Sequence, residues 1–365
     1  MSFPAPLKLT CSIAFVACLL ATACKPGEPE DIEDVSFPNY TPGFTVVADS
    51  GDGVQRPQDL EFHPFADRAN ELWIVNRGTE NTGSDVVIVH DAGEPGQQAE
   101  QRQDGNAWHF MNLTTALAFS DDNGNWATSP EVTDANHSGG TFTGPSLWSS
   151  DLDVFAQPSG GNGSHLDMLH QSPNSMGVAH EVDNAFWVFD GYSNEIVRYN
   201  FADDHGPGND DHADARVRRY SSLPIARMPD TPSHMVVDKA TDWLYICDPG
   251  NAQVLRMDIN SGTKAADLPF TNEPLALLAQ MEGEVWEVFA DLDLDTPSGI
   301  ALDGGTLYVG DAETGEIIAF ETQTGLELGR LNTGAGKLLG IEVDPEGNLW
   351  FVDRRNNTVT RVDQN

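Results

Sequence analysis

Basic side chains are scarce in this chain of 365 residues, which carries 19 lysines and arginines against 57 aspartates and glutamates and has a net charge of −38. A surface of this sign repels the phosphates of nucleic acids and the headgroups of anionic lipids. Nucleic acids and bare anionic membranes are therefore excluded as partners. The same charge favours bound cations, or simply solubility in a salty medium.

Cysteine is also rare, with four residues in the whole sequence. Cys11 and Cys18 lie in an apolar stretch, residues 9–23, that follows Lys8 and is too short to cross a bilayer comfortably. A charged start followed by such a stretch is typical of a secretory signal. The segment before Cys24 resembles a bacterial lipobox, which implies cleavage before Cys24 and lipidation of its thiol. An ordinary signal peptide, cleaved nearby, is the alternative.

The lipoprotein resemblance also implies a location. Residue 25 is lysine, whereas aspartate at this place signals inner-membrane retention in Gram-negative lipoproteins. We therefore expect an exported protein, lipid-anchored to the cell envelope at the outer membrane and facing the periplasm or the surface, with the lipid as its only membrane contact. Residues 24–40 have too few apolar side chains to pack and are interpreted as an acidic, flexible tether.

One pattern recurs along the chain: an apolar residue, an aromatic residue, two mostly apolar residues, and then Asp or Asn. The copies are residues 72–76, 186–190, 244–248, 307–311 and 349–353, with a sixth, degenerate copy at 116–120 and Trp126. A polar turn and a β-rich run follow each full copy, and an alternating strand precedes the pattern. Short strands of this composition, separated by Asp, Asn and Gly turns, predict antiparallel sheets.

Six such modules can bury both faces of their sheets by stacking radially, which predicts an all-β fold, the six-bladed β-propeller. A further strand, residues 44–48, precedes the first module. We expect it to join the last blade and close the ring, because closure removes exposed sheet edges. The repeats resemble NHL-type propellers over residues 41–365, with long insertions at 121–174 and 201–216.

The aspartates that end four of the aromatic strands recur too regularly to form a catalytic set. They are Asp190, Asp248, Asp311 and Asp353. Such a carboxylate can accept N–H bonds from the turn that follows the strand, so a structural role is predicted. Cys247 lies within an apolar strand and is expected to be a small buried hydrophobe. With the signal removed and Cys24 lipidated, no internal disulfide is possible.

The two insertions are where we expect chemistry, because long loops on a rigid scaffold are often functional. The second insertion mixes carboxylates, which suit calcium, with imidazoles, which suit zinc, in a spacing that matches no EF-hand. Its candidate metal ligands are Asp203, Asp204, His205, Asp210, Asp211 and His212. A solvated acidic loop without a metal is the alternative.

Two more histidines lie on expected inner strands. His180 points into the packing between blades, so it is either a hydrogen-bonded core histidine or a metal ligand that reaches His170 or the acidic loop. His234 begins an inner strand near the central channel, and it is a further candidate metal ligand. Tyr192, His165 and His170 are the candidate ligand-binding residues.

Two enzyme families of the same architecture offer comparisons. The turn at residues 189–194 looks like that of the peptidyl-amidoglycolate lyases, which are zinc propellers. In that family zinc-binding histidines follow prolines, whereas here serines do, and His234 comes one residue late. Lactonase-type propellers hold a central calcium with carboxylates and an Asn. Here Asp59 matches, but glycines occupy three corresponding positions.

The sequence therefore predicts a ligand- or protein-binding module with a divalent metal, calcium or zinc, as its candidate cofactor. The alternative is a metal-dependent hydrolase or lyase that uses His180, His205, His212 or His234 with nearby aspartates. Binding is preferred over catalysis, because the sequence has no serine nucleophile elbow, phosphate loop or Cys/His zinc knuckle.

Overall fold

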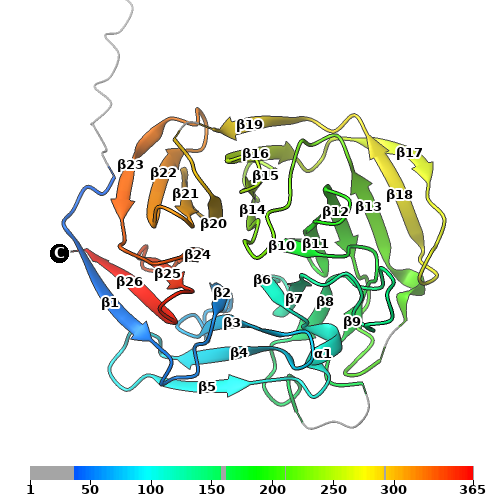
Figure 1. Ribbon diagram of the computed structural model, residues 1–365, viewed down its shortest axis with the longest axis horizontal. Helices are drawn as coiled ribbons and strands as arrows, with labels where there is room; N and C mark the ends of the chain where they lie inside the picture. Colours follow the sequence, from blue (N-terminus) through cyan, green and yellow to red (C-terminus); the bar gives the residue numbers. More distant parts are fainter. Residues whose placement is uncertain (1–36, 158–161, 210, 292, 365) are drawn as a thin grey trace, which may run out of the picture. The chain divides into compact units, whose positions relative to one another are not determined.

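The computed structural model describes residues 37–157, 162–209, 211–291 and 293–364. Six sheets surround a central axis in this part of the chain, which is the six-bladed β-propeller that the sequence predicts (Figure 1). The expected signal peptide (1–23), Cys24 and all of the expected tether before residue 37 lie outside the described residues. Among the described residues, no helix has the length and apolar character needed to span a membrane.

Each blade is a set of neighbouring strands whose first member lies next to the axis (Figure 1). Blade one contains β2 (Pro57–Phe62), β3 (Leu72–Thr79), β4 (Gly83–His90) and β5 (Gln98–Arg102). Blade two, preceded by α1 (Ala107–Phe110), contains β6 (Thr114–Phe119), β7 (Asn125–Pro130), β8 (Ser146–Ser149) and β9 (Asp167–Met168). Blade three contains β10 (Ser175–Val182), β11 (Ala185–Asp190), β12 (Glu195–Asn200) and β13 (Arg216–Tyr220).

The remaining blades follow the same plan. Blade four contains β14 (Met235–Asp238), β15 (Trp243–Asp248), β16 (Gln253–Asp258) and β19 (Trp286–Ala290). Blade five contains β20 (Pro297–Asp303), β21 (Thr306–Asp311), β22 (Glu316–Glu321) and β23 (Glu327–Asn332). Blade six contains β24 (Leu338–Val343), β25 (Leu349–Asp353), β26 (Thr358–Gln364) and the early strand β1 (Pro42–Ala48).

The second strand of each blade is the aromatic strand of the repeat. β7 and β11 are buried along their whole length, because neighbouring blades cover both faces of each sheet. Contacts between aromatic rings join adjacent blades, as where the ring of Trp73 in β3 lies 5.3 Å from that of Trp126 in β7. Burial on both faces explains why β11 is almost continuously apolar in the sequence, whereas β7 is buried despite its Asn, Thr and Ser residues.

The ring closes as predicted. β1 pairs antiparallel with β26, from Pro42 opposite Gln364 to Ala48 opposite Val359. Val47 and Ala48 are buried in the same core cluster as residues of blades one and six. An N-terminal strand thus completes the last blade, so that the outer edge of β26 is paired.

The strand-end aspartates are structural, which confirms the prediction. Asp311 is 1% exposed, and its carboxylate accepts four backbone N–H bonds. Two come from the following turn, at Glu313 and Thr314, and two from the preceding loop between blades, at Asp295 and Thr296. Asp353 makes the same four bonds, two from the following turn and two from the preceding connection, whereas Asp190 holds its turn and pairs with Arg219. Cys247 is buried, as expected.

Replacement of this carboxylate should be costly. We expect Asp311→Ala to lower the free energy of unfolding by about 3 kcal/mol, because four buried N–H donors lose their acceptor. Asp303→Ala, at the exposed end of β20 in the same blade, is the matched control and should change it by less than about 0.5 kcal/mol. Urea unfolding followed by circular dichroism measures both, and equal effects would contradict the assigned role.

One expectation about the insertions needs correction. Residues 121–174 are not one irregular insertion, because they include β7, β8 and β9 of blade two. The second insertion connects β12 to β13 and ends at the first residue of β13, so it lies within blade three. The strands of blade two were hard to recognise because they are short and rich in Ser, Thr and Asn, although β7 is wholly buried.

A third insertion was not expected. Residues between β16 and β19 form a hairpin of β17 (Thr263–Asp267) and β18 (Leu277–Glu282). β18 pairs in parallel with β13, so the hairpin of blade four extends the sheet of blade three to six strands (Figure 1).

The end of the expected tether packs against the propeller. Phe37 donates its backbone N–H to the carbonyl of Leu328 at 2.9 Å, and its ring lies 5.4 Å from that of Tyr308. Tyr40 is partly buried against the core cluster of blades five and six. Within the expected tether, residues 37–40 are thus in contact with the fold.

Candidate metal centre and ligand site

Two histidines and a glutamate from three separate segments converge at the outer part of blade three. His170 follows β9, His212 begins the short 3-10 helix η1 (His212–Asp214) before β13, and Glu273 lies between β17 and β18. The Nδ1 atoms of His170 and His212 lie 2.7 and 3.1 Å from Oε2 of Glu273. One ligand atom from each residue lies within 4.8 Å of the other two.

The backbone and an aromatic ring hold the first histidine in place. The N–H of His170 donates to Oε1 of Glu273 at 2.8 Å, and the side-chain amide of Asn272 donates to the carbonyl of His170. Phe142 stacks on the imidazole with ring centroids 3.6 Å apart. The side chain of His170 is only 6% exposed, so its orientation is set by the fold.

The second histidine has a carboxylate on each side of its ring. Nε2 of His212 lies 3.3 Å from Oδ1 of Asp167, a fully buried residue. Asp167 thus faces one ring nitrogen of His212, and Glu273 faces the other. The carboxylate of Asp211 accepts the N–H of Ala213 and caps η1, which fixes the backbone around His212. An imidazole held by one carboxylate while its other nitrogen faces a second donor is the usual geometry of a metal-bound histidine.

The two carboxyl groups of the cluster, Glu273 and Asp167, have pKa values shifted in opposite directions. Burial alone would raise the pKa of Glu273, but hydrogen bonds and charge from His170 and His212 lower it to about 2. Burial raises the pKa of Asp167 to about 7, in spite of the charge of His212. Glu273 is therefore ionised at neutral pH, as a metal ligand must be.

Two hollows border the cluster. One has a volume of about 300 Å³ and is lined by four histidines, His109, His165, His170 and His212, with Trp108 and Phe142 among the aromatic residues. The other has a volume of about 370 Å³ and is lined by His170 together with Tyr192, Arg219 and Leu268. The three candidate ligand-binding residues from the sequence thus line these two hollows, and His170 belongs to both.

The donor set decides which ion the cluster fits. Two imidazoles and one carboxylate are zinc ligands, whereas calcium requires six or more oxygen atoms. Sequence reasoning named both histidines, but His170 only as a ligand-binding residue, and it missed Glu273. The apolar run of β18, at residues 277–281, was the available signal that a strand lies beside this glutamate.

Most of the other candidate ligands in the acidic loop make local contacts. Nε2 of His205 lies 3.3 Å from Oδ1 of Asp214, and the backbone N–H of Asp203 donates to the same carboxylate. Asp204 accepts the N–H of Gly206. Among the described residues, the groups that could hold a metal include His212 but none of these, nor Asp211. Asp210 lies outside the described residues.

His180 lies at the central channel and not beside the acidic loop. Its Nε2 is 3.1 Å from the carbonyl of Asp183, and its Nδ1 is 3.0 Å from the ammonium of Lys239. Burial, followed by the charge of Lys239, lowers its pKa. Asp121 and Asp122 could complete a metal group with His180, but Lys239 already pairs with Asp121 at 2.6 Å. His180 is therefore a neutral, hydrogen-bonded histidine.

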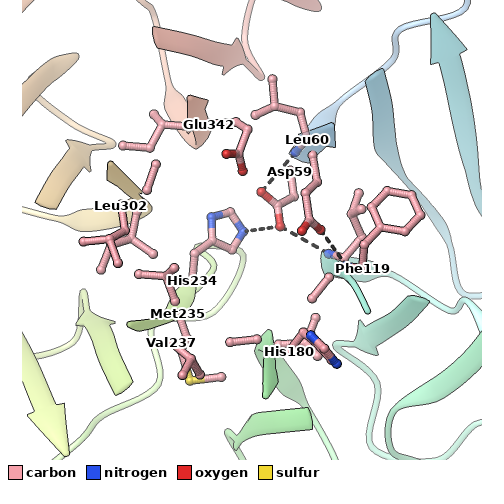
Figure 2. A pocket seen from close by; sticks show the side chains of 18 of the residues that line it. Asp59, Leu60, Phe119, His180, His234, Met235, Val237, Leu302 and Glu342 are labelled. Atoms are coloured by element: carbon pink, nitrogen blue, oxygen red, sulfur yellow. Dashed lines mark hydrogen bonds and ion pairs between the residues drawn. The ribbon is translucent and has the colours of Figure 1, made fainter. Parts of the chain in front are cut away.

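The inner strands of all six blades line a central cavity of about 210 Å³. Figure 2 shows Asp59 and Glu342 there, with His234 between the inner strands. Nε2 of His234 lies 3.0 Å from the carbonyl of Thr115 and 3.7 Å from Oδ2 of Asp59. Burial lowers the pKa of His234 to about 4 and raises those of Asp59 and Glu342 to about 8.

A third carboxyl group lines the same cavity. Burial, with the charge of Glu342, raises the pKa of Glu61 well above its ordinary value. Sequence reasoning considered only Asp59. The signal for the other two was present, because Glu61 and Glu342 occupy the same position of the repeat, where other copies have Ala118, Ala179, Val236 and Ala301.

No protein-family model and no curated protein matches this chain. Among solved structures it is similar to auxiliary nutrient binding proteins from Bacteroides thetaiotaomicron VPI-5482 and Bacteroides ovatus ATCC 8483. The TM-scores are 0.56 and 0.52 at 10% and 11% identity, over 89% of this chain and 76% and 77% of theirs. A structure of a nidogen/laminin complex matches with a TM-score of 0.51 and 12% identity, over 79% of this chain and 85% of that one. At these identities the similarity shows the fold alone.

Proposed function

We propose that this protein is an exported, lipid-anchored propeller of the NHL type that acts as a binding module. Its ligand site is the histidine-lined hollow beside blade three, with a zinc ion held by His170, His212 and Glu273. The convergence of these three side chains from three insertions is the observation that carries the proposal. The lipobox-like segment before Cys24 supports export and anchoring.

The three side chains of this cluster are not members of the hydrophobic clusters between the blades. Burial of a carboxylate and two imidazoles costs free energy unless each is paired, and the hydrophobic clusters between the blades hold the ring together. Among the described residues, only one other group of three potential metal ligands occurs, and Lys239 pairs with it. A metal ion would compensate the buried charge of Glu273.

The surrounding hollow explains how a ligand would reach the metal. Three protein ligands leave a fourth position of tetrahedral zinc open. The adjoining hollow, with His109 and His165 in its lining, has room for a small molecule beside that position. The similar solved structures described as nutrient binding proteins support a binding role for this fold.

A metal-dependent hydrolase or lyase remains the second candidate. The observation that favours it is the donor set itself, since two histidines and a glutamate with an open position also make catalytic zinc sites. Of the histidines first considered for catalysis, only His212 lies in this cluster. Hydrolysis of model esters by the zinc-loaded protein, lost in His212→Ala, would support this candidate over binding alone.

Zinc titration tests the proposal. We expect the protein to bind one zinc ion, and both His212→Ala and Glu273→Gln to weaken binding by about 100-fold or more, because each removes one of three ligands. His205→Ala is the matched control, since this histidine lies in the same loop and pairs with Asp214 outside the cluster. It should leave the affinity unchanged.

Calorimetry and metal analysis of the purified protein provide the measurement. Zinc should also raise the unfolding temperature of the wild type and of His205→Ala, but not of His212→Ala. A wild type that binds no zinc, or a His205→Ala variant as impaired as His212→Ala, would overturn the metal assignment.

A further inference from the structure

Three carboxyl groups share the central cavity, with Asp59 buried and Glu61 and Glu342 partly buried, and this arrangement is separate from the proposed metal centre. Asp59 and Glu61 lie on β2 of blade one and Glu342 on β24 of blade six, so all three come from two adjacent inner strands. All three line the same cavity of about 210 Å³. The opposite part of its lining is apolar, with Met235, Ile300 and other residues of blades three to five.

The protein supplies little compensation for these groups. Asp59 accepts two backbone N–H bonds, from Leu60 and Leu117. Glu61 and Glu342 each accept one, from Phe119 and Val343 respectively. Three ionised carboxylates in one buried cavity require positive charge nearby, because like charges and loss of hydration both oppose ionisation.

The basic side chain that lines the cavity, Lys239, pairs with other residues and not with the three carboxyl groups. Among the described residues that line it, Lys239 is the single lysine or arginine. Its ammonium pairs with Asp121 at 2.6 Å and with Nδ1 of His180 at 3.0 Å, at the mouth of the channel. His234 faces Asp59, but its Nε2 is hydrogen-bonded to the carbonyl of Thr115, so the ring stays neutral.

A neutral acceptor is also present on the cavity wall. Nδ1 of His234 is buried and has no hydrogen-bond partner among the described residues, and the residue is 4% exposed. Because Nε2 carries the proton that is donated to Thr115, Nδ1 is a free acceptor. A cationic ligand that donates an N–H bond to this atom would also bring positive charge to the carboxyl groups, two of which, Asp59 and Glu342, are labelled in Figure 2.

The spacing of the carboxyl groups does not suit a bare metal ion. Asp59, Glu61 and Glu342 do not form a group whose ligand atoms lie within 4.8 Å of one another. The volume corresponds to roughly seven water-sized groups, since a water occupies about 30 Å³ in the liquid. A small molecule with a cationic end and a hydrocarbon body fits both the charged and the apolar walls.

We propose that the central channel binds a small aliphatic ammonium ion. Its ammonium group donates to Nδ1 of His234 and to the nearest carboxylate, and the charges of Asp59, Glu61 and Glu342 together compensate it without all three contacting it. Its hydrocarbon chain lies against the apolar inner strands of the opposite blades. Entry is through the mouth at Asp121 and Lys239. At neutral pH, binding of the cation displaces protons from the carboxyl groups and so releases them to the solvent.

Calorimetry with n-butylamine tests this inference on the whole protein. We expect binding at pH 7 to 8 with release of protons, measured in two buffers of different ionisation enthalpy, and no binding of n-butanol, which has the same length without the charge. The double variant Asp59→Asn/Glu342→Gln should weaken amine binding at least about tenfold, because amides keep the shape but not the charge.

Two further variants keep the result clear. Ala301→Leu narrows the channel without altering a carboxyl group, and it should also weaken amine binding. The site is then tested by two different changes, so the conclusion does not rest on the correct folding of the double variant alone. His212→Ala should bind butylamine normally while it loses zinc, which separates this site from the proposed metal centre.

Three results would overturn the inference. The first is a wild type that does not bind butylamine. The second is equal binding of butanol, which would make the charge irrelevant. The third is binding of calcium in place of the amine with the same sensitivity to Asp59→Asn/Glu342→Gln, which would show an inorganic cation site.

Discussion

A chain that begins at residue 49 should fail to form a stable propeller, whereas a chain that begins at residue 41 should fold. The first lacks β1, which pairs with β26 along residues 42–48. Its loss uncovers the backbone edge of β26 and removes the buried Val47 and Ala48 from the core between blades six and one. We expect a loss of about 5 kcal/mol or more, which is comparable with the whole stability of an average domain.

Thermal unfolding followed by circular dichroism, together with size-exclusion chromatography, measures this effect. The chain from residue 41 is the matched control. It lacks residues 1–40, as the shorter chain does, but it keeps β1. A peptide of residues 41–48 added to the shorter chain should restore part of the stability by pairing with β26. Equal unfolding temperatures for the two chains would show that the ring does not depend on this closure.

The free energy of unfolding should fall as the pH rises from 6.5 to 8.5. Burial raises the pKa of Asp59 and of Glu342 to about 8, and that of Glu61 well above its ordinary value. The folded protein therefore holds protons that the unfolded chain has already released. When the native state binds more protons, stability decreases with pH. Asp167, whose pKa is about 7, acts in the same direction.

Two buried histidines determine the lowest pH at which the effect of the carboxyl groups on stability can be measured alone. The pKa values of His63 and His234 are lowered to about 4 by burial, so the native state binds fewer protons than the unfolded chain between pH 4 and 6.5. In that interval their contribution to stability rises with pH and opposes the carboxyl groups. Above pH 6.5 the histidine contribution decreases as the unfolded chain loses its last histidine protons, and above about pH 7.5 the carboxyl effect remains alone.

The fall should amount to roughly 2 to 4 kcal/mol between pH 6.5 and 8, since each retained proton contributes about 1.4 kcal/mol per pH unit. Asp59→Asn/Glu342→Gln should be more stable than the wild type at pH 8, and its stability should fall less over this range, with the remaining fall due to Glu61 and Asp167. Urea unfolding at 0.5 M salt, which screens the general acidic charge, gives the measurement. Asp303→Asn serves as the exposed control, and a flat wild-type profile would contradict the prediction.

The repeat made the fold readable from sequence. The second strand of a blade is covered on both faces, and in five copies it is a mostly apolar run with an aromatic second residue and a terminal Asp or Asn. These five copies and a degenerate sixth specify the ring. The closing strand was also recognisable, as an extra β-rich run at residues 44–48 before the first copy. β8 and β9 could not be found, because strands of four and two residues carry almost no periodic signal.

The candidate site was predictable only in its components. His170 and His212 were both named from the sequence, but the residue that joins them, Glu273, lies on a hairpin of blade four that crosses to blade three. Pairing of β13 with β18 joins residues about sixty positions apart, and no local pattern specifies such a partner. The central Glu61 and Glu342 became apparent only when their blades were placed side by side.

The hairpin also makes one junction of the ring different from the other five. Among the described strands, one connection joins neighbouring blades at every other junction, but three connections join blades three and four: from β13 to β14, from β16 to β17, and from β18 to β19. Separation of blades three and four, whether by mechanical force or by thermal fluctuation, would therefore have to stretch three chain connections at once. We therefore expect the ring to open first at another interface between blades. Blade three, which carries the histidine cluster, and blade four should then move together as one rigid unit.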